Sequence, residues 1–202
     1  MTRIHEFNGS TSFRVVAVSG SPAERSSTAE LVDYVIARLP ASVPAARHIR
    51  LRDLDPRALL GADRGDAQVA AAQRDLEEAD GVIIATPVFK AAYSGLLKAF
   101  LDGLPQFGLA GKAVLPLATG GSLAHVLALD YALRPVLQSM GARHIVQSHF
   151  VSASQITRDD GVLKLSPEAE GPLGEAVFHF GLALGCPIAA PLLGHPRPAR
   201  AA

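Results

Sequence analysis

The sequence predicts an α/β protein in which helices cover both faces of a parallel sheet. Short apolar runs alternate along the chain with longer segments whose apolar residues have the 3.6-residue spacing of a helix. The strongest of these runs are hydrophobic throughout, which is typical of parallel strands buried on both faces. The length of 202 residues fits one domain of this class.

The first elements follow a polar start. Residues 14–19 (RVVAVS) form a continuous apolar run and predict a strand. Residues 26–39 have apolar side chains at helical spacing, and Pro40 ends this predicted helix. A weaker, short strand is predicted at residues 47–51 (RHIRL).

The middle of the chain contains the most hydrophobic strand. Residues 67–79 are rich in Ala, Gln and Glu and predict a helix that ends at residues 80–81 (DG). Residues 82–86 (VIIAT) predict the third strand. Pro87 is expected to end this strand because proline has no N–H to donate to a sheet. A helix is predicted at residues 93–104.

Two prolines interrupt the later elements. These elements are a fourth strand, a long helix, a fifth strand and a last helix, at 112–118, 122–140, 143–151 and 167–184. Pro116 is an unfavourable residue inside a strand, and Gly141 is expected to cap the long helix. Pro135 leaves the Tyr131 carbonyl without its helical donor, and a one-residue π-bulge near Asp130 would accommodate the distortion.

Five strands and five helices in this order suit a flavodoxin-like three-layer sandwich, with a five-stranded parallel sheet of order 2-1-3-4-5. Ligands bind such sheets beyond the carboxyl ends of the strands, where the order reverses between strands 1 and 3. The loops after strands 1, 3 and 4 are therefore the candidate site. We assign this domain to residues 13–186, and we expect flexible ends at 1–12 and 187–202 because both are rich in Gly, Pro, Ser or Ala.

The loop after the first strand indicates a phosphate site. It reads SGSPAERSST from Ser19 to Thr28, so that five hydroxyl side chains surround Arg25 where a helix begins. A helix N-terminus offers unpaired N–H groups and partial positive charge, and an arginine adds a fork of donors. The loop is neither a Walker A sequence nor a GxGxxG fingerprint. An ordinary polar loop with a Ser or Thr N-cap would have the same composition.

The other two loops add apolar surface and accessible backbone. Val88 and Phe89 place apolar side chains at the switch point. Residues 118–122 (ATGGS) contain two glycines, which let the backbone approach a ligand and leave its N–H groups unobstructed. Alone, each loop is also explained by packing or by a turn with Ser122 as N-cap. Together the three loops match a ligand with a phosphate tail and a flat ring carrying acceptors, and flavin mononucleotide (FMN) fits this description.

Composition excludes several other classes of protein. Acidic and basic residues balance at 19 each, which argues against a nucleic-acid surface. The single cysteine, Cys186, cannot form an internal disulfide, and no Cys/His spacing indicates a metal site. No run approaches the roughly 20 apolar residues of a membrane span, and residues 1–12 lack the apolar segment of a signal peptide. We therefore expect a cytoplasmic protein without a membrane, nucleic-acid or metal partner.

At these loops the sequence resembles the NADPH-dependent FMN reductase family, specifically the flavin reductase of two-component alkanesulfonate monooxygenase systems. Four pieces carry the resemblance in the same order, from about Arg14 to Val151: VVAVSGSP, DGVIIATPVFKAAYSGLLKAFLD, GKAVLPLATGG and AHVLALDYALRPVL. Two features depart from that pattern. The first loop is shorter than in close relatives, and Phe89 stands where a tyrosine is common.

The resemblance implies that NADPH or NADH reduces FMN and that the reduced flavin passes to a monooxygenase for sulfonates or related organosulfur compounds. The residues implied to bind FMN are Ser19, Ser21, Arg25, Ser26 and Ser27 at the phosphate, Pro87, Val88 and Phe89 at the isoalloxazine edge, and Thr119, Gly120 and Gly121 at its pyrimidine side. Lys90 is placed to contact the phosphate of the pyridine nucleotide, and His125 to contact the flavin or the pyridine nucleotide. A solvated surface position explains Lys90 at least as well, and a position on the helix surface explains His125 better.

Hydride transfer from nicotinamide C4 to flavin N5 is chemistry of the cofactors, so no catalytic side chain is assigned. The Gly120 and Gly121 amides are the candidates to stabilise the reduced, anionic ring. The helix at 122–140 is apolar on nearly every side, which indicates a subunit interface. The resemblance places Tyr131 at that interface and favours a homo-tetramer over a dimer.

Two other functions remain open on the sequence. The first is a flavoprotein that retains FMN and reduces a quinone, an azo dye or a metal oxyanion. Ping-pong kinetics would indicate this function, whereas ordered sequential kinetics would indicate FMN as a substrate. The second is a flavodoxin-type electron carrier, a class that is usually acidic. The absence of net charge in this chain disfavours it.

Overall fold

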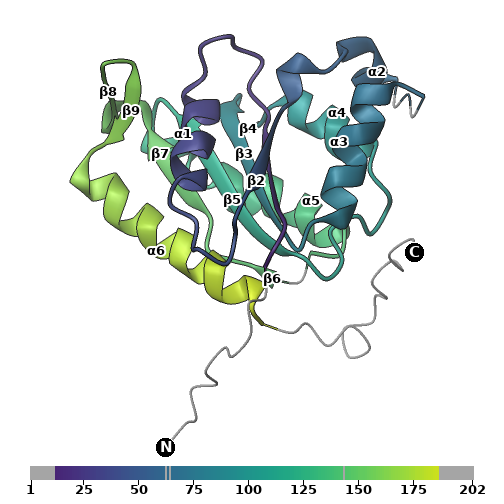
Figure 1. Ribbon diagram of the computed structural model, residues 1–202. Coiled ribbons are helices and arrows are strands. Elements are labelled where there is room, and N and C mark those ends of the chain that lie inside the picture. The colour runs from purple at the N-terminus through teal and green to yellow at the C-terminus, as the bar shows by residue number, and fades with distance from the viewer. Residues whose placement is uncertain (1–11, 62, 64, 143, 187–202) are drawn as a thin grey trace, which may run out of the picture.

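The computed structural model describes residues 12–186 except 62, 64 and 143, and its main sheet is mostly parallel with helices on both faces (Figure 1). The strand order is β2-β1-β3-β5, and both β6 and β7 pair in parallel with β5. The strands are β1 (Val15–Ser19), β2 (Ala46–Arg50), β3 (Gly81–Phe89), β5 (Ala113–Gly120), β6 (His144–Ile145) and β7 (His149–Ser152). The helices are α1 (Ser27–Ile36), α2 (Pro56–Leu60), α3 (Ala67–Glu78), α4 (Gly95–Asp102), α5 (Arg134–Ser139) and α6 (Pro167–Leu184).

This topology confirms the predicted flavodoxin-like order 2-1-3-4-5, because β6 and β7 together occupy the place of the predicted fifth strand. β6 pairs with Ala113 and Val114, whereas β7 pairs with β5 from Leu117 onwards. Pro116 lies in β5 between these two paired segments. A proline has no N–H to donate, and the pairing at this edge of β5 is interrupted beside it.

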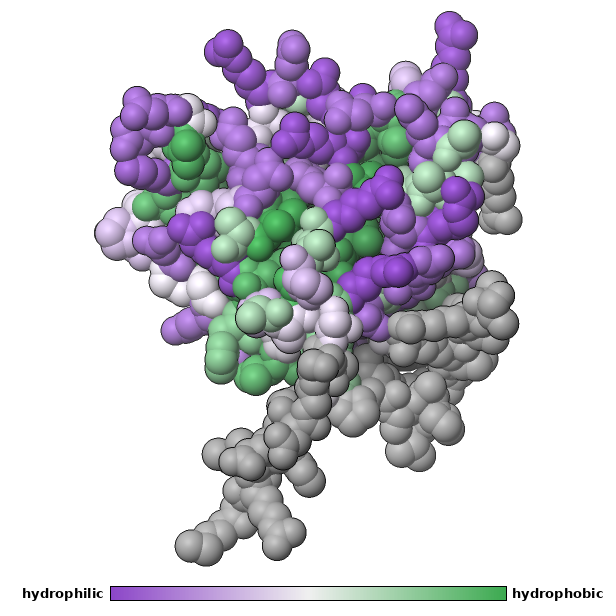
Figure 2. Space-filling view, in the orientation of Figure 1, coloured by the Kyte–Doolittle hydropathy of each residue, from purple (hydrophilic) through white to green (hydrophobic). Residues whose placement is uncertain are grey.

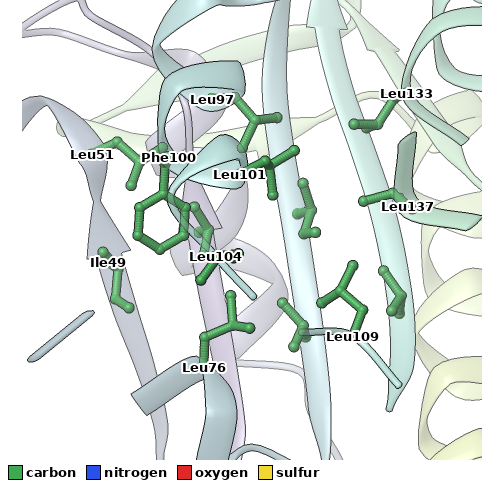
Figure 3. Close-up of a cluster of buried hydrophobic side chains, with 14 of the residues drawn as sticks. Ile49, Leu51, Leu76, Leu97, Phe100, Leu101, Leu104, Leu109, Leu133 and Leu137 are labelled. Atoms are coloured by element: carbon green, nitrogen blue, oxygen red, sulfur yellow. The ribbon is translucent and has the colours of Figure 1, made fainter. Parts of the chain in front are cut away.

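Alternate residues of the strands belong to two separate hydrophobic clusters, one on each face of the sheet. Val16 and Val18 of β1 pack with α3, α4 and α5, while Val15 and Ala17 pack with α1 and α6. Figure 3 shows the first cluster, in which α4 places Phe100 between β2 and the middle of the sheet. The period-2 alternation of strand side chains explains why both faces are covered.

The third strand is longer than predicted. β3 continues through Pro87 to Phe89, with Pro87 in register with Thr119 of β5. The prediction that Pro87 ends the strand was wrong. The fixed φ of proline is compatible with extended backbone, and near the end of a strand few backbone N–H groups are needed for pairing. A two-residue turn then leads into β4 (Ala92–Tyr93), which pairs antiparallel with β3. The helix predicted at 93–104 therefore begins only at Gly95.

The long helix predicted at 122–140 is divided into three parts. A 3-10 turn (Leu123–His125), a π-helical turn (Leu129–Leu133) and α5 follow one another. The π turn contains Asp130 and Tyr131, as predicted from Pro135, and Gly141 ends the segment with φ of +85°.

Several elements were not predicted. They include α2, the 3-10 turns at Leu51–Asp53 and Ala153–Gln155, and the hairpin of β8 (Ile156–Asp159) and β9 (Val162–Leu165). Of the ends expected to be flexible, residues 1–11 and 187–202 lie outside the described residues. Within the described part of the chain, no helix is long and apolar enough to cross a membrane.

Candidate active site

The three loops singled out from the sequence lie at one edge of the sheet. β1, β3 and β5 are parallel neighbours, so their carboxyl ends emerge side by side (Figure 1). The first loop follows Ser19, the second is the β3–β4 hairpin, and the third follows Gly120. Figure 2 shows hydrophilic side chains over the upper edge in that view, where the first loop lies.

Two buried hydrogen bonds join these loops. The hydroxyl oxygens of Thr28 and Thr119 are 2.6 Å apart, which links the start of α1 to the end of β5. The Ser94 hydroxyl donates to the Gly20 carbonyl at 2.5 Å and accepts from the Leu97 amide at 3.1 Å. The second and first loops are thereby held together at the N-terminus of α4. Thr28 and Ser94 were not predicted as site residues.

Gly20 is required for the close approach of the first loop to α4. A Cβ added at Gly20 would lie 2.7 Å from the Leu97 Cβ and 3.0 Å from the Ser94 hydroxyl oxygen. Only a glycine leaves space for this contact. The position explains why the sequence has a glycine directly after the first strand.

Like Thr28, Ser19 and Ser26 of the first loop have hydroxyls that are hydrogen-bonded within the protein. Ser19 Oγ lies 2.9 Å from His48 Nε2, and His48 Nδ1 lies 2.7 Å from Asp33 Oδ1. Burial lowers the pKa of His48 against the opposing effect of Asp33, so the ring is neutral near pH 7. Its Nδ1–H then donates to the carboxylate, and its Nε2 accepts from Ser19. Ser26 is the N-cap of α1, and its hydroxyl accepts from the Ala29 amide at 3.1 Å.

Ser21, Arg25 and the first amides of α1 are available for a ligand. Ser21 is buried, and its oxygen accepts only a long hydrogen bond of 3.3 Å from the Ala23 amide. Arg25 is exposed. The amides of Ser27 and Thr28 open α1 and have no acceptor within the helix. A second guanidinium, that of Arg158, donates to Ser27 Oγ at 2.9 Å, and it was not predicted from the sequence.

The β3–β4 hairpin carries the apolar part of the site. Val88 is buried, whereas Phe89 is 50% exposed. The turn residues Lys90 and Ala91 have φ of +51° and +61°. Left-handed backbone costs non-glycine residues roughly 1–2 kcal/mol each, and such strain concentrates at functional sites. The exposed ring beside this strained turn gives the site a flat apolar surface.

The third loop presents backbone to open space. Thr119 is 7% exposed and faces Thr28. A Cβ at Gly120 would meet the Phe150 ring at 3.0 Å, whereas a Cβ at Gly121 would meet nothing within 4 Å. His125 folds back over this turn, and its buried Nδ1 has no hydrogen-bond partner among the described residues. The amide-rich turn and the orphaned nitrogen are features that a ligand with polar ring atoms would complement.

Exposed apolar side chains adjoin the third loop. They come from the 3-10 turn, the π turn and the residues between them: Leu123 69%, Val126 42%, Leu127 56% and Tyr131 79% exposed. β4 contacts the π turn directly, so these residues lie near the hairpin that carries Phe89. Grouped exposed hydrophobic residues of this kind are typical of interaction sites.

Comparisons with known proteins identify the family of the chain. The sequence pattern of the family described as "NADPH-dependent FMN reductase" matches residues 13–157, a segment that ends before Arg158. The chain is 40% identical over 171 residues to an FMN reductase (NADPH) from Escherichia coli (strain K12), covering 85% of this chain and 90% of the relative. It is 31% identical over 166 residues to an NADH-dependent FMN reductase from Pseudomonas putida, covering 74% and 89%.

A solved structure has the same fold. The apo form of an NADH:FMN oxidoreductase (EMOB) superposes with a TM-score of 0.81 and 49% sequence identity, covering 94% of this chain and 97% of that one. The family match spans all three loops of the candidate site. The chain therefore belongs to the NADPH-dependent FMN reductase family and is an oxidoreductase whose cofactors are FMN and a nicotinamide nucleotide.

Proposed function

We propose that FMN binds across the carboxyl edge of the sheet, with its phosphate on the first loop and its ring between the hairpin and the third loop. One observation carries this proposal: the three loops are fastened to one another by buried hydrogen bonds, Thr28 to Thr119 and Ser94 to Gly20. A site assembled in this way is formed before the ligand arrives, which reduces the entropic cost of binding.

The phosphate is proposed to lie at the start of α1. Ser21 and Ser27 supply hydroxyl donors, Arg25 supplies a guanidinium, and the amides of the first helical turn point to the same place. The Ser19 and Ser26 hydroxyls are hydrogen-bonded to His48 and to Ala29, and both residues shape the loop around the phosphate.

The ring is proposed to rest against Pro87, Val88 and Phe89. When bound, FMN supplies the redox chemistry by accepting a hydride at N5 from the nicotinamide. The apolar hairpin keeps water from one side of the ring. On the other side, the Gly120 and Gly121 amides donate toward the pyrimidine oxygens and stabilise negative charge there.

The nicotinamide nucleotide is proposed to bind over the exposed side of the flavin ring. Lys90 stands next to Phe89 in an exposed turn, where an ammonium group suits a nucleotide phosphate. His125 lies beside Gly120 and offers a second polar contact. The protein's contribution to the reaction is to stack the two rings and exclude water.

We propose further that reduced FMN leaves for a partner monooxygenase, as in the sulfonate systems that the sequence resembles. The site lies at an open edge of the sheet, so that the flavin can leave without unfolding any element. Tyr131 and its apolar neighbours are proposed to form the contact between subunits of a tetramer, since the π turn leaves them exposed.

Steady-state kinetics test this function. Purified protein is mixed with NADPH or NADH and increasing FMN, and the loss of the pyridine-nucleotide absorbance is followed. The proposal predicts oxidation that saturates with FMN and double-reciprocal lines that intersect. Parallel lines with a quinone or azo acceptor would instead assign an FMN-retaining reductase. Negligible oxidation of both nucleotides would overturn the proposal.

A further inference from the structure

The β8–β9 hairpin brings a charged residue from late in the chain to the first loop. Its turn, Asp160-Gly161, has φ of +48° and +79°, and this Asp-Gly turn suits a tight hairpin. Ile156 of β8 and Leu165 of β9 are half-buried and pack against the cluster that contains Leu31 and Val35 of α1. The hairpin is thereby fixed beside α1 (Figure 1).

Arg158 of β8 connects two residues of the first turn of α1. Its Nη2 lies 2.7 Å from Glu30 Oε2 and 2.9 Å from Ser27 Oγ, and its Nε donates to Glu30 at 3.0 Å. The planar guanidinium can make these contacts together because its donors form a rigid fork. The Glu30 carboxylate fixes the orientation of the guanidinium plane, and the guanidinium in turn fixes the orientation of the Ser27 side chain.

This contact determines what the Ser27 hydroxyl can do. A guanidinium only donates, so Ser27 Oγ is the acceptor and its own proton must point to another partner. A hydroxyl that accepts from a charged donor becomes a better donor itself. Ser27 is the first residue of α1, where the amides of the helix N-terminus also point. Its proton is therefore available for an anion in front of the helix.

We propose that Arg158 is a positioning residue for the flavin phosphate, acting through Ser27 to select phosphorylated flavin over riboflavin. This inference rests on the proposed FMN site. The Glu30 carboxylate, 2.7 Å from Arg158 Nη2, offsets the charge of the guanidinium and holds it in place, so Arg158 acts on the phosphate through Ser27. The structure thus gives the β8–β9 hairpin a role in recognition in addition to its packing on α1.

Equilibrium titrations of the full chain with FMN and with riboflavin test the proposal. Arg158→Ala should raise the Kd for FMN about 5- to 10-fold, as expected for the loss of a charge-assisted contact, and leave the Kd for riboflavin within about twofold. The Kd of Arg158→Lys for FMN should lie between those of the wild type and Arg158→Ala, because one ammonium group does not reproduce the planar set of guanidinium donors. Lys164→Ala is the matched control, since Lys164 lies on the same hairpin and pairs with Asp159 at 2.6 Å. It should change neither affinity.

A double-mutant cycle separates positioning from general support of the fold. In a Ser27→Ala background, Arg158→Ala should have little further effect on FMN affinity, because its partner is already absent. An undiminished effect in that background, or equal losses of FMN and riboflavin affinity in both Arg158 variants, would overturn the inference. Arg158 variants that keep the wild-type preference for FMN overturn it and leave the proposed function intact. A wild-type protein that binds both flavins alike overturns both.

Discussion

Thr28 and Thr119 share a hydrogen bond of 2.6 Å between their hydroxyl oxygens, although 91 residues separate them. Both side chains are buried, with 2% and 7% exposed. The bond fixes the N-terminus of α1 relative to the third loop. These two segments lie at the two ends of the proposed flavin site. A contact that sets the distance between two half-sites affects binding as well as stability.

Replacing either threonine by valine should therefore affect both properties. Thr28→Val leaves the Thr119 hydroxyl buried without a partner and should lower the free energy of unfolding by about 1–3 kcal/mol, because a lone buried hydroxyl bears its full desolvation cost. The double variant with Thr119→Val should recover part of that loss, since no polar group remains unpaired. FMN affinity should stay reduced in both. Urea unfolding and flavin titration measure the two quantities. Full recovery of affinity in the double variant would contradict the structural role assigned to this pair.

Glycines at the two ends of the site should respond differently to alanine. Gly20→Ala places a methyl group 2.7 Å from the Leu97 Cβ and should destabilise the fold by about 1–3 kcal/mol. Gly121→Ala meets nothing within 4 Å and should leave stability within about 0.5 kcal/mol. It should weaken FMN binding by about tenfold if the ring approaches this backbone. Thermal unfolding with and without FMN distinguishes the two variants, and unchanged FMN affinity in Gly121→Ala would remove the third loop from the site.

Stability should fall as the pH drops below about 6.5. Burial lowers the pKa of His48 in the folded state, so the unfolded chain takes up a proton first as the pH falls. The stabilisation that neutral His48 contributes is complete above the pKa of this histidine in the unfolded chain. It is lost as the pH falls through the lower pKa that His48 has in the folded protein. His48→Gln should make the unfolding free energy less dependent on pH between about 7 and 5. His149, whose pKa burial also lowers, should contribute a remaining slope that His149→Gln removes. Identical slopes in wild type and His48→Gln would show that His48 is not buried as described.

A glycine in the turn of the β3–β4 hairpin should stabilise the protein. Ala91 has φ of +61°, a conformation that costs alanine roughly 1–2 kcal/mol. Ala91→Gly should raise the free energy of unfolding by about 0.5–1 kcal/mol after the larger chain entropy of glycine is subtracted. Ala99→Gly, inside α4, is the control and should lower it by about the same amount. Destabilisation by both changes would mean that Ala91 is not in the left-handed region.

Tyr131 should control the oligomeric state. Its side chain is 79% exposed on the π turn, and a subunit interface would cover it. Tyr131→Ser should shift the mass measured by light scattering from a tetramer to a smaller species. Phe178→Ser is the comparison, because Phe178 is 64% exposed on α6. If only Phe178→Ser changes the mass, the interface lies on α6 instead.

The sheet and the three loops could be predicted because each depends on local sequence. Continuous apolar runs mark the strands, and Pro135 marked the π turn that the structure has at Leu129–Leu133. The rule that a proline ends a strand was misleading at Pro87, because this strand runs on to Phe89. Asp160-Gly161 is a hairpin signal in the sequence, but the β8–β9 hairpin that it forms was not predicted.

The contacts that assemble the site could not be predicted from spacing. Ser94 and Gly20 are 74 residues apart, and Arg158 and Ser27 are 131 apart. Nothing in a single sequence relates a serine at a helix start to a particular carbonyl elsewhere. The register of β1, β3 and β5 brings the first two residues together, and the packing of the β8–β9 hairpin on α1 brings Arg158 to Ser27. Both are properties of the folded chain.

A crystal structure of the protein soaked with FMN tests the central claim most directly. The account predicts the phosphate at the N-terminus of α1, within hydrogen-bond distance of Ser27, and the isoalloxazine ring against Phe89 with its pyrimidine side at Gly121. Flavin bound at any other surface, with these three loops empty at saturating FMN, would contradict it.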